Sequence, residues 1–245
     1  ALMDDAAALE IPEGQTLVVT ADALIAGVHC FGTEDAALLA KKLLRRNLSD
    51  LAGKGAEPYC CFLTLQLPKD TAEPWVARFA EGLGEDCAAF TIALAGGDLA
   101  ATPGPMSASL TALGLTPRGS MLKRAGAKPG DALYVSGTIG DAALGLRLTR
   151  SGMPLSLEHF LIRRYLLPEP RLALGQKLRG IAGACMDISD GLAQDAAQLA
   201  SASGVALKVE AARVPLSAEA GAELTRNPSL LETILTGGDD YELLF

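Results

Sequence analysis

Residues 15–22 read QTLVVTAD, and residues 34–52 read EDAALLAKKLLRRNLSDLA. The first stretch is a β-branched, apolar run that ends in a carboxylate, which predicts a strand. The second stretch places Leu38, Leu39, Leu43 and Leu48 near helical spacing, which predicts a helix. This order of strand and helix decides the fold class, because the same alternation recurs along the rest of the chain.

The alternation continues through both halves of the chain. In the first half we expect strands at 59–67, 91–95 and 106–115 and a helix at 73–87. In the second half we expect a strand at 132–136, a helix after Gly140, helices between 156 and 179, a strand into Asp187, a helix after Gly191, a strand at 206–210 and a helix at 217–225. Such alternation predicts an α/β (α+β) fold. The composition changes around residues 117–131, which predicts two domains, 1–117 and 118–245.

The overall composition excludes several classes of protein. Of the 245 residues, 49% are hydrophobic and 20% charged, which is typical of a globular protein with a real core. The net charge of −8 argues against nucleic acid or an anionic membrane as a partner. We see no 18-residue apolar run and no secretory signal, and therefore expect a cytoplasmic protein. The chain begins without Met and stops inside an apolar run, so we expect it to be part of a longer protein.

The five cysteines are odd in number and form no CxxC motif. A zinc site or a disulfide framework would need a different spacing and a different count. We therefore expect buried free thiols in a reducing compartment.

Six short motifs carry aspartates, and little else in the chain can do chemistry. They are Asp4-Asp5, Thr20-Ala21-Asp22, Asn47-Leu48-Ser49-Asp50, Gly96-Gly97-Asp98, Asp187-Ile188-Ser189-Asp190-Gly191 and Gly237-Gly238-Asp239-Asp240-Tyr241-Glu242. Most lie where an apolar run meets Gly, Ser or Asn, so we expect them at strand ends or tight turns. A single motif of this kind is more often a turn or a helix cap than a site. Several together shift the balance towards function.

Gathered carboxylates would need a cation. Two unit charges about 4 Å apart repel by roughly 4 kcal/mol at an effective dielectric constant near 20. With only two histidines, the candidate ligands are hard oxygens, which suit magnesium better than zinc. The motifs therefore indicate phosphate chemistry assisted by magnesium.

The common phosphate-binding and hydrolase motifs are absent from the sequence. It contains no GxxxxGK[ST], no GxGxxG after a strand, no HRD or DFG, and no GxSxG. We expect His159 to have a surface or packing role. His29 follows a glycine turn just beyond Asp22, although most isolated histidines at such positions are structural. Arg124 and Lys128 flank a glycine-rich loop whose charge suits phosphate oxygens, and a solvated surface loop is an equal alternative.

The ordered set of motifs resembles the thiamine-monophosphate kinase family of the aminoimidazole-ribonucleotide-synthetase-like superfamily. The matching pieces, in order, are Asp4-Asp5-Ala6-Ala7, Thr20-x-Asp22 with Gly27-Val28-His29, Asn47 to Ala52, Gly96-Gly97-Asp98, Arg124 to Asp131, Pro168-x-Pro170-Arg171, Asp187 to Leu192 and Gly237 to Leu243. Each piece is short, but together they span nearly the whole chain. The resemblance implies a two-domain fold whose N-terminal sheet joins that of a second copy in a dimer barrel, with nucleotide held between the N- and C-terminal halves.

The resemblance also implies an activity, a metal and a set of site residues. The activity is ATP-dependent phosphorylation of thiamine monophosphate to thiamine diphosphate, with ATP as co-substrate and several Mg²⁺ ions. By the family's pattern the metal residues are Asp5, Thr20, Ala21, Asp22, Asp50, Asp98, Asp187 and Asp190. The ATP-binding residues are Gly97, Asp98, Arg124 and Ser189, and the residues that face thiamine monophosphate are His29 and Asp239. We expect no nucleophile and no acid–base residue, because the acceptor phosphate is already ionised at neutral pH.

Three features depart from the family's pattern. Ala21 stands where many relatives carry Thr, and Asp239 stands where Glu is common. The C-terminal part that gives relatives an aromatic wall for the substrate is not in this chain. Two alternatives remain open: another ATP-dependent synthetase of the same superfamily, or a non-catalytic metal-binding scaffold. A selenophosphate-synthetase relative would usually carry a reactive Cys near its N-terminus, and none precedes Cys30.

Overall fold

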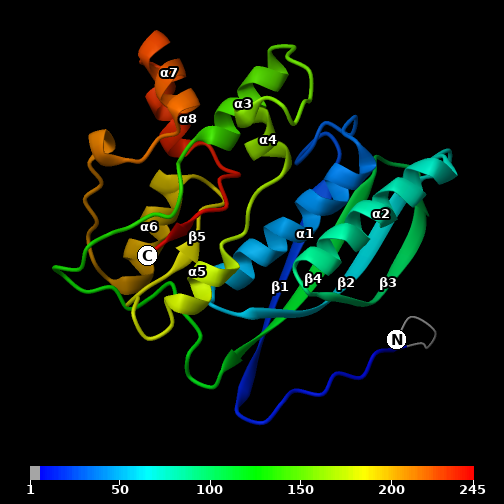
Figure 1. Ribbon diagram of the computed structural model, residues 1–245, viewed down its shortest axis with the longest axis horizontal. Coiled ribbons are helices and arrows are strands. Elements are labelled where there is room, and N and C mark those ends of the chain that lie inside the picture. The colour runs from blue at the N-terminus through cyan, green and yellow to red at the C-terminus, as the bar shows by residue number, and fades with distance from the viewer. Residues whose placement is uncertain (1–5) are drawn as a thin grey trace. The chain divides into compact units, whose positions relative to one another are not determined.

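The computed structural model describes residues 6–245 (Figure 1). The chain divides into two compact units. Unit 1 comprises the residues up to Leu51 together with Ala56–Gly119, and unit 2 comprises Ala52–Gly55 together with Ser120–Phe245. Asp5, a predicted metal residue, and its motif neighbour Asp4 lie outside the described residues.

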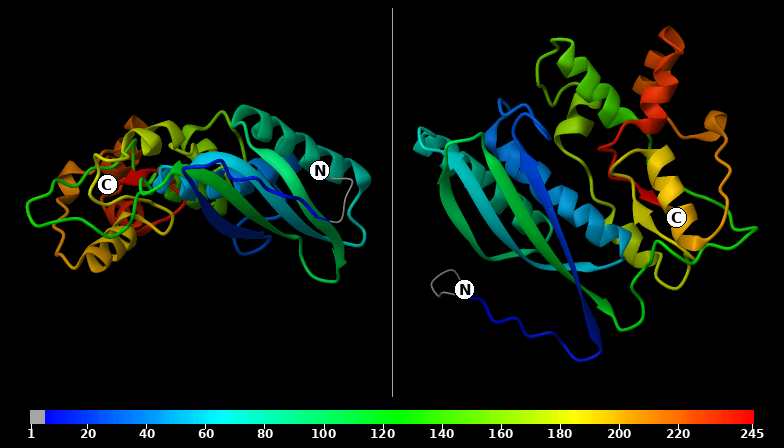
Figure 2. Two further views of the ribbon diagram at one scale, coloured as in Figure 1. Left: turned by 90° about the horizontal axis from the view of Figure 1, so that it is seen from below. Right: turned by 180° about the vertical axis from the view of Figure 1, so that it is seen from behind.

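Unit 1 is a four-stranded sheet with two helices on one face. The strands are β1 (Gln15–Ile25), β2 (Glu57–Pro68), β3 (Ala93–Thr102) and β4 (Ser107–Pro117), in the order β1-β4-β2-β3. β4 runs antiparallel to both of its neighbours, while β2 and β3 are parallel. The helices α1 (Ala36–Gly53) and α2 (Glu73–Ala89) lie side by side on the same face of this sheet (Figures 1 and 2).

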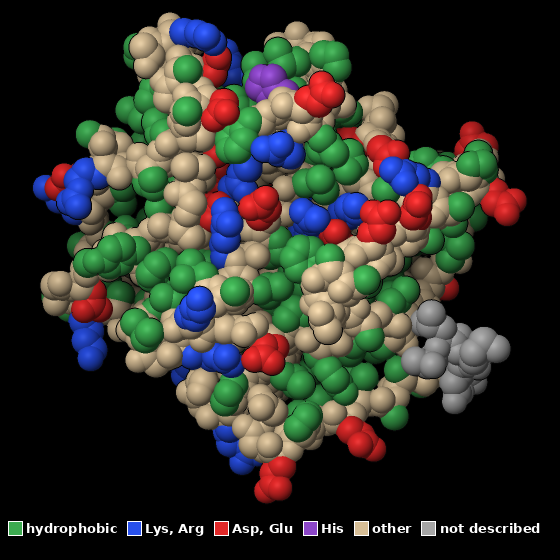
Figure 3. Space-filling view, in the orientation of Figure 1, with side chains coloured by type: hydrophobic (Ala, Val, Ile, Leu, Met, Phe, Trp, Pro, Cys, Tyr) green, Lys and Arg blue, Asp and Glu red, His purple; other side chains and the backbone are tan. Residues whose placement is uncertain are grey.

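The two faces of this sheet differ in how they are covered. On the helix side, Leu24 and Leu110 are fully buried, as are Leu43 and Leu48 of α1. On the other face, Ala7 and Leu9 of the N-terminal segment pack on Cys60, Ala95 and Leu113. Burial of these aliphatic side chains is the main force that holds the layers together. Over the helices, Lys and Arg side chains alternate with Asp and Glu (Figure 3), as in the ion pairs Lys41–Glu85 and Arg78–Glu81.

Unit 2 is mostly helical around a small sheet. Its elements are α3 (Asp141–Arg150), α4 (Phe160–Leu166), α5 (Leu172–Lys177), β5 (Met186–Asp187), α6 (Leu192–Ser203), the 3₁₀-helix η1 (Ala211–Arg213), α7 (Ala218–Arg226), α8 (Leu230–Thr236) and β6 (Leu243–Leu244). β5 pairs antiparallel with β6, and Val135 forms an isolated bridge to Leu244. Ile139, Met186, Ile188 and Leu244 belong to one buried cluster around this sheet.

The α/β class is confirmed, and most predicted elements are present, but two strands predicted in unit 2 are wrong. Residues 132–136 contribute only the bridge at Val135, and residues 206–210 form neither strand nor helix. The first stretch is a mainly apolar run and the second alternates in polarity, yet neither extends into a ladder with a neighbouring strand. Leu207 and Val135 instead pack as loop residues against the core. Helix α8 was not predicted. None of the helices within residues 6–245 is long and apolar enough to cross a bilayer.

The expectation that the aspartates lie at strand ends or tight turns is wrong for three of them. Asp22 lies inside β1, Asp98 inside β3 and Asp50 inside α1. The strand predicted at 91–95 continues through Gly96 and Gly97 to Thr102. Its backbone pairs with β2 on both sides of one register shift between Cys61 and Phe62, and this pairing outweighs the low strand propensity of glycine.

Candidate functional site

In unit 1, β1 and α1 bring together a threonine, two aspartates and an arginine. Thr20 and Asp22 are alternate residues of β1 and therefore share one face of the strand. Thr20 Oγ1 donates a 2.5 Å hydrogen bond to Asp50 Oδ2, and Arg46 Nη2 lies 2.8 Å from Asp22 Oδ2. Arg46 and Asp50 are one turn apart on α1, so a pair on the helix faces a pair on the strand. The predicted metal residues Thr20, Asp22 and Asp50 are thus neighbours.

The Asp22 carboxylate is held in one orientation. Its Oδ1 accepts a 2.9 Å hydrogen bond from the Ala23 amide, and its Oδ2 is paired with Arg46. Arg46 also donates from Nη1 to the Ala23 carbonyl at 3.3 Å. The Asp22 side chain remains 31% exposed, so its oxygens are accessible from solvent.

His29 has a defined hydrogen-bonding state. The Ile25 amide donates a 3.1 Å hydrogen bond to His29 Nδ1, which must therefore be unprotonated. In the neutral ring the hydrogen is then on Nε2, which is left as a donor. This loop between β1 and α1 is shaped further by Glu34, whose carboxylate accepts hydrogen bonds from three successive backbone amides, those of Phe31, Gly32 and Thr33.

Three further predicted residues of unit 1 do not add a side-chain oxygen to this group. Asp98 lies on β3, at the opposite edge of the sheet from Asp22 on β1. Three strand spacings separate these edges, or about 14 Å. Ala21 is exposed on β1 and offers no side-chain oxygen. Gly97 has a packing reason to be glycine, since a Cβ there would lie 2.0 Å from the Leu63 carbonyl oxygen.

In unit 2, two chain turns lie against each other through backbone hydrogen bonds. The first follows β5 and carries Ser189 and Asp190; the second precedes β6 and carries Asp239. The Asp239 amide donates to the Ser189 carbonyl at 2.9 Å, and the Tyr241 amide donates to the Ile188 carbonyl at 2.8 Å. The structure therefore brings the predicted residues Ser189, Asp190 and Asp239 together, next to Asp187 at the end of β5.

The second turn has an unusual backbone. Asp239 and Tyr241 have φ angles of 68° and 51°, in the left-handed region that non-glycine residues rarely adopt. A Cβ on Gly238 would lie 2.2 Å from the Ser189 carbonyl oxygen, so only glycine fits there. The Tyr241 hydroxyl donates a 3.0 Å hydrogen bond to Asp239 Oδ1. Strain of this kind persists only where the surroundings fix it, and it is common at binding sites.

The first turn is held by Asp195, a residue outside the predicted site set. Asp195 Oδ2 accepts hydrogen bonds from the Ser189 and Asp190 amides, both at 3.0 Å. Burial raises the pKa of Asp195 above its ordinary value, and these hydrogen bonds oppose that shift. An acidic residue in the first turn of a helix, here α6, is the signal that could have identified it.

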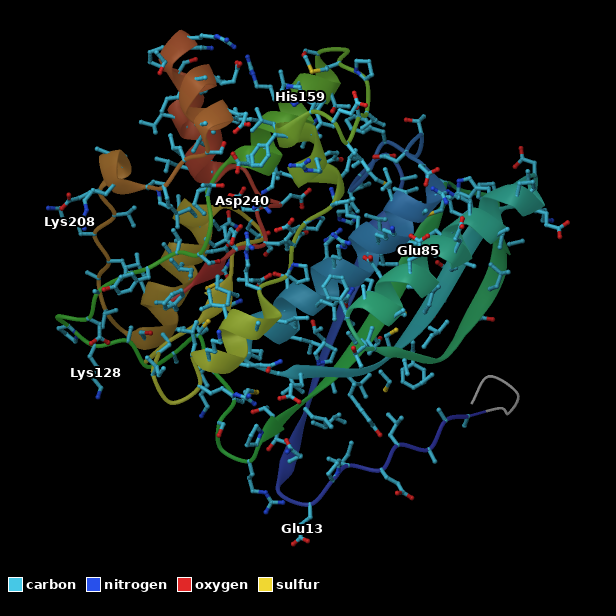
Figure 4. The ribbon with its side chains drawn as sticks, viewed as in Figure 1. Glu13, Glu85, Lys128, His159, Lys208 and Asp240 are labelled. Atoms are coloured by element: carbon cyan, nitrogen blue, oxygen red, sulfur yellow. The ribbon has the colours of Figure 1, made fainter. Side chains whose placement is uncertain are left out.

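A buried network of charges lies behind the second turn. Glu242 is fully buried and contacts Arg164 at 2.8 Å and Arg171 at 2.5 and 2.6 Å. Ser136 Oγ donates a 2.6 Å hydrogen bond to the same carboxylate. Asp240 lies in the interior of unit 2 (Figure 4) and accepts a hydrogen bond from the Gly140 amide at 2.9 Å. Burial raises the pKa of Asp240 to about 8.

The loop that carries Arg124 is anchored through Ser203 of α6. The Gly126 and Ala127 amides each donate to Ser203 Oγ at 3.2 Å, and Ser203 Oγ donates to the Arg124 carbonyl at 3.3 Å. Lys128 projects outward from this loop (Figure 4). A cavity of about 480 Å³ lies beside the loop and also touches Phe245, with a mainly apolar lining.

In each unit, several of the predicted site residues are neighbours of one another. Within residues 6–245, no three carboxylate, imidazole or thiol groups are arranged so that they could hold a metal ion. Thr20, Asp22 and Asp50 are neighbours in unit 1, and Asp187, Ser189, Asp190 and Asp239 are neighbours in unit 2.

Comparison with known proteins identifies the fold and the family. Residues 3–116 match the family described as AIR synthase related protein, N-terminal domain, and residues 128–242 match its C-terminal domain. The chain is therefore an AIR-synthase-type protein. It is 47% identical to thiamine-monophosphate kinase of Caulobacter vibrioides over 99% of this chain and 70% of that protein. The chain belongs to the thiamine-monophosphate kinase family.

Two solved structures agree with this assignment. The crystal structure of thiamine-monophosphate kinase from Stenotrophomonas maltophilia matches with a TM-score of 0.90 and 43% identity, over 99% of this chain and 78% of that one. A structure described as AaThiL complexed with AMPPCP and TMP matches with a TM-score of 0.87 and 34% identity, over 96% of this chain and 76% of that one.

Proposed function

We propose that this protein transfers the γ-phosphoryl group of ATP to thiamine monophosphate, which yields thiamine diphosphate and ADP. The observation that carries this proposal is the likeness, along nearly the whole chain, to a relative solved with AMPPCP and TMP. The contacts of Thr20 with Asp50 and of Ser189 with Asp239 add support, because they bring predicted site residues together in both units.

The residues of the site suit this reaction. Phosphoryl transfer depends mainly on in-line positioning and on neutralising charge. The phosphate of thiamine monophosphate has a second pKa near 6 and is largely dianionic at neutral pH, so no base is needed to activate it. The main obstacle is repulsion between two polyanions. A site rich in carboxylates that hold Mg²⁺, and poor in nucleophiles, fits that requirement.

The donor set fits magnesium. Thr20, Asp22 and Asp50 in unit 1 and Asp187 and Asp190 in unit 2 offer hard oxygen ligands, which Mg²⁺ prefers. Bound Mg²⁺ would neutralise phosphate charge. Magnesium keeps several waters and takes one or two carboxylates each, so small groups of aspartates are sufficient.

We assign the other predicted residues to the two substrates. Gly97, Asp98, Arg124 and Ser189 would contact ATP. His29 and Asp239 would contact thiamine monophosphate: His29 can donate from Nε2 to an anionic oxygen, and the Asp239 carboxylate can attract the positively charged ring of thiamine. The hydrogen bonds that fix His29 and Asp239 would orient both before the substrate binds.

We also propose a homodimer built through unit 1. Within the described chain, β1 and β3 are edge strands with one neighbour each, and Val19 and Leu99 on them are 56% and 60% exposed. Exposed apolar edges favour pairing with another strand. Pairing of β3 with β1 of a second copy would place Asp98 of one copy beside the strand that carries Asp22 in the other. The five free cysteines support a reducing, cytoplasmic location.

The decisive experiment is turnover of ATP by the purified protein with Mg²⁺, with and without thiamine monophosphate, and identification of products by chromatography. We expect ADP and thiamine diphosphate in equal amounts. ADP formed without consumption of thiamine monophosphate would instead indicate another synthetase of the superfamily. Absence of both turnover and an ATP-dependent thermal shift would indicate a scaffold.

A further inference from the structure

Arg46 places a permanent positive charge inside the group of proposed metal ligands. Its side chain is only 12% exposed and pairs with Asp22 at 2.8 Å. It also donates to the Ala23 carbonyl on the same strand. An arginine so placed remains protonated at any working pH.

The neighbouring arginine, Arg45, has a different partner from that of Arg46. Arg45 points towards α2, where its guanidinium makes two contacts with Asp86, at 2.6 and 3.0 Å. Successive residues of a helix point about 100° apart, so Arg45 joins α1 to α2 while Arg46 joins α1 to β1. Structural ion pairing between the helices is thus already supplied by Arg45.

We propose that Arg46 is a positioning residue of the metal site: it fixes the Asp22 carboxylate against α1 and competes with the metal for Asp22 Oδ2. This inference rests on the proposed function, in which Asp22 is a metal ligand. In this proposal Arg46 acts through Asp22.

The physical reason is the balance of charge around β1 and α1. Asp22 pairs with Arg46, and Asp50 accepts the hydroxyl of Thr20, two residues before Asp22 on β1, so the guanidinium offsets part of the negative charge there when no metal is bound. A divalent cation that approaches Asp22 then meets a positive charge and an oxygen that is already paired. Arg46 therefore weakens metal binding, while it keeps Asp22 in a single orientation.

The test measures Mn²⁺ binding by electron paramagnetic resonance, without ATP or thiamine monophosphate. We expect Arg46→Met to bind Mn²⁺ about tenfold more tightly than the unchanged protein, because the competing charge is gone. Arg46→Gln, which keeps a donor for the Ala23 carbonyl, should tighten binding to a similar extent and serves if the Met variant does not fold. Arg46→Lys keeps the charge and should stay within about threefold.

The matched control is Lys41→Met on the same helix. Lys41 pairs with the half-exposed Glu85 on α2, so its removal changes the net charge equally but leaves β1 untouched. We expect its Mn²⁺ affinity to equal that of the unchanged protein. Equal tightening in Lys41→Met would show a general charge effect and overturn the inference, as would unchanged or weaker binding in both Arg46→Met and Arg46→Gln.

The Mn²⁺-binding test and the turnover test can fail independently of each other. If the protein makes thiamine diphosphate but the Arg46 variants bind Mn²⁺ as the unchanged protein does, only the inference fails. If the variants bind Mn²⁺ more tightly and no thiamine diphosphate is formed, only the proposed function fails. Absence of Mn²⁺ binding by the unchanged protein overturns the inference.

Discussion

Asp50 lies on α1 among buried residues and also belongs to the proposed metal site. Its helix neighbours Asn47 and Ser49 are fully buried, yet its own carboxylate turns to β1 and accepts the Thr20 hydroxyl. Asp98 is different, since it is exposed on an edge strand. Substitutions at the two residues therefore test the metal proposal once at a partly buried aspartate and once at an exposed one.

We predict that Asp50→Asn and Asp98→Asn each lower thiamine diphosphate formation at least about a hundredfold, because charge stabilisation is the main catalytic term. Asn has the same shape as Asp, and its oxygen can still accept the Thr20 hydroxyl, so the melting temperature should change little. Activity by chromatography and unfolding by circular dichroism measure the two effects. Asp70→Asn, in an exposed turn, is the control. Full activity in both site variants would contradict the metal proposal.

Asp240 predicts a pH dependence of stability. Arg164 and Arg171 are balanced by Asp141 and Glu242 in the buried network, so a third carboxylate would be in excess. Burial, with a smaller contribution from the charge of Asp141, raises the pKa of Asp240 from 3.8 to about 8. Between these values the folded state holds a proton that the unfolded state has released, so stability due to this group is present below pH 3.8 and is lost as pH rises through about 8.

We therefore expect the free energy of unfolding in urea to fall between pH 5.5 and 8.5, and Asp240→Asn to flatten this dependence. The amide cannot ionise, and its oxygen can still accept the Gly140 amide. Asp70→Asn should retain the slope of the unchanged protein. An identical slope in Asp240→Asn would show that another group is responsible.

At the scale of elements, Glu242 joins β6 to two helical segments. It pairs with Arg164 of α4 and with Arg171 just before α5. We predict that Glu242→Gln destabilises the protein by about 3–5 kcal/mol, because it removes the buried carboxylate that Arg164 and Arg171 share. Glu169→Gln removes a 66% exposed partner of Arg171 and should cost less than about 1 kcal/mol. Urea unfolding measures both, and equal losses would contradict the buried-network interpretation.

A contact between a cysteine of β2 and a cysteine of α2 predicts which cysteine reacts first. Cys61 of β2 is fully buried and its thiol hydrogen-bonds to Cys87 of α2, which lowers the pKa of Cys87. Burial raises the pKa of Cys185 to about 12. The thiolate is the reactive form, so iodoacetamide should label Cys87 first and Cys185 much more slowly. Peptide mass spectrometry over time measures this order, and equal rates would contradict it.

Local patterns in the sequence predicted the features that depend on neighbouring residues, such as helices and turn motifs. Leucine spacing predicted α1, and the ordered aspartate motifs predicted residues that the fold brings together, such as Thr20 with Asp50 and Ser189 with Asp239. The motifs could not show that Asp98 lies on the far edge of the sheet, because strand order depends on long-range pairing. Arg164 with Glu242 was missed for the same reason: the two are 78 residues apart and neither carries a local signal of the contact.

At the scale of the whole molecule, the edge strands test the proposed dimer. We predict that the protein is a dimer by analytical ultracentrifugation and that Leu99→Lys shifts it to a monomer, since a charged edge opposes strand pairing. Val209→Lys places the same charge on unit 2, where Val209 is 41% exposed, and should leave the dimer intact. A monomeric unchanged protein at micromolar concentration would contradict the proposal.

The bridge between Ser136 and Leu243 has a consequence for synthesis of the chain on the ribosome. The Ser136 amide donates to the Leu243 carbonyl and the Leu243 amide to Ser136 Oγ, across 107 residues. At about 5–20 residues per second, translation needs about 5–20 s to cover that interval. During that time the nascent chain around Ser136 lacks the segment with which it forms these hydrogen bonds, and its apolar residues remain accessible to chaperones. Unit 1, complete by Gly119, can fold well before that strand emerges.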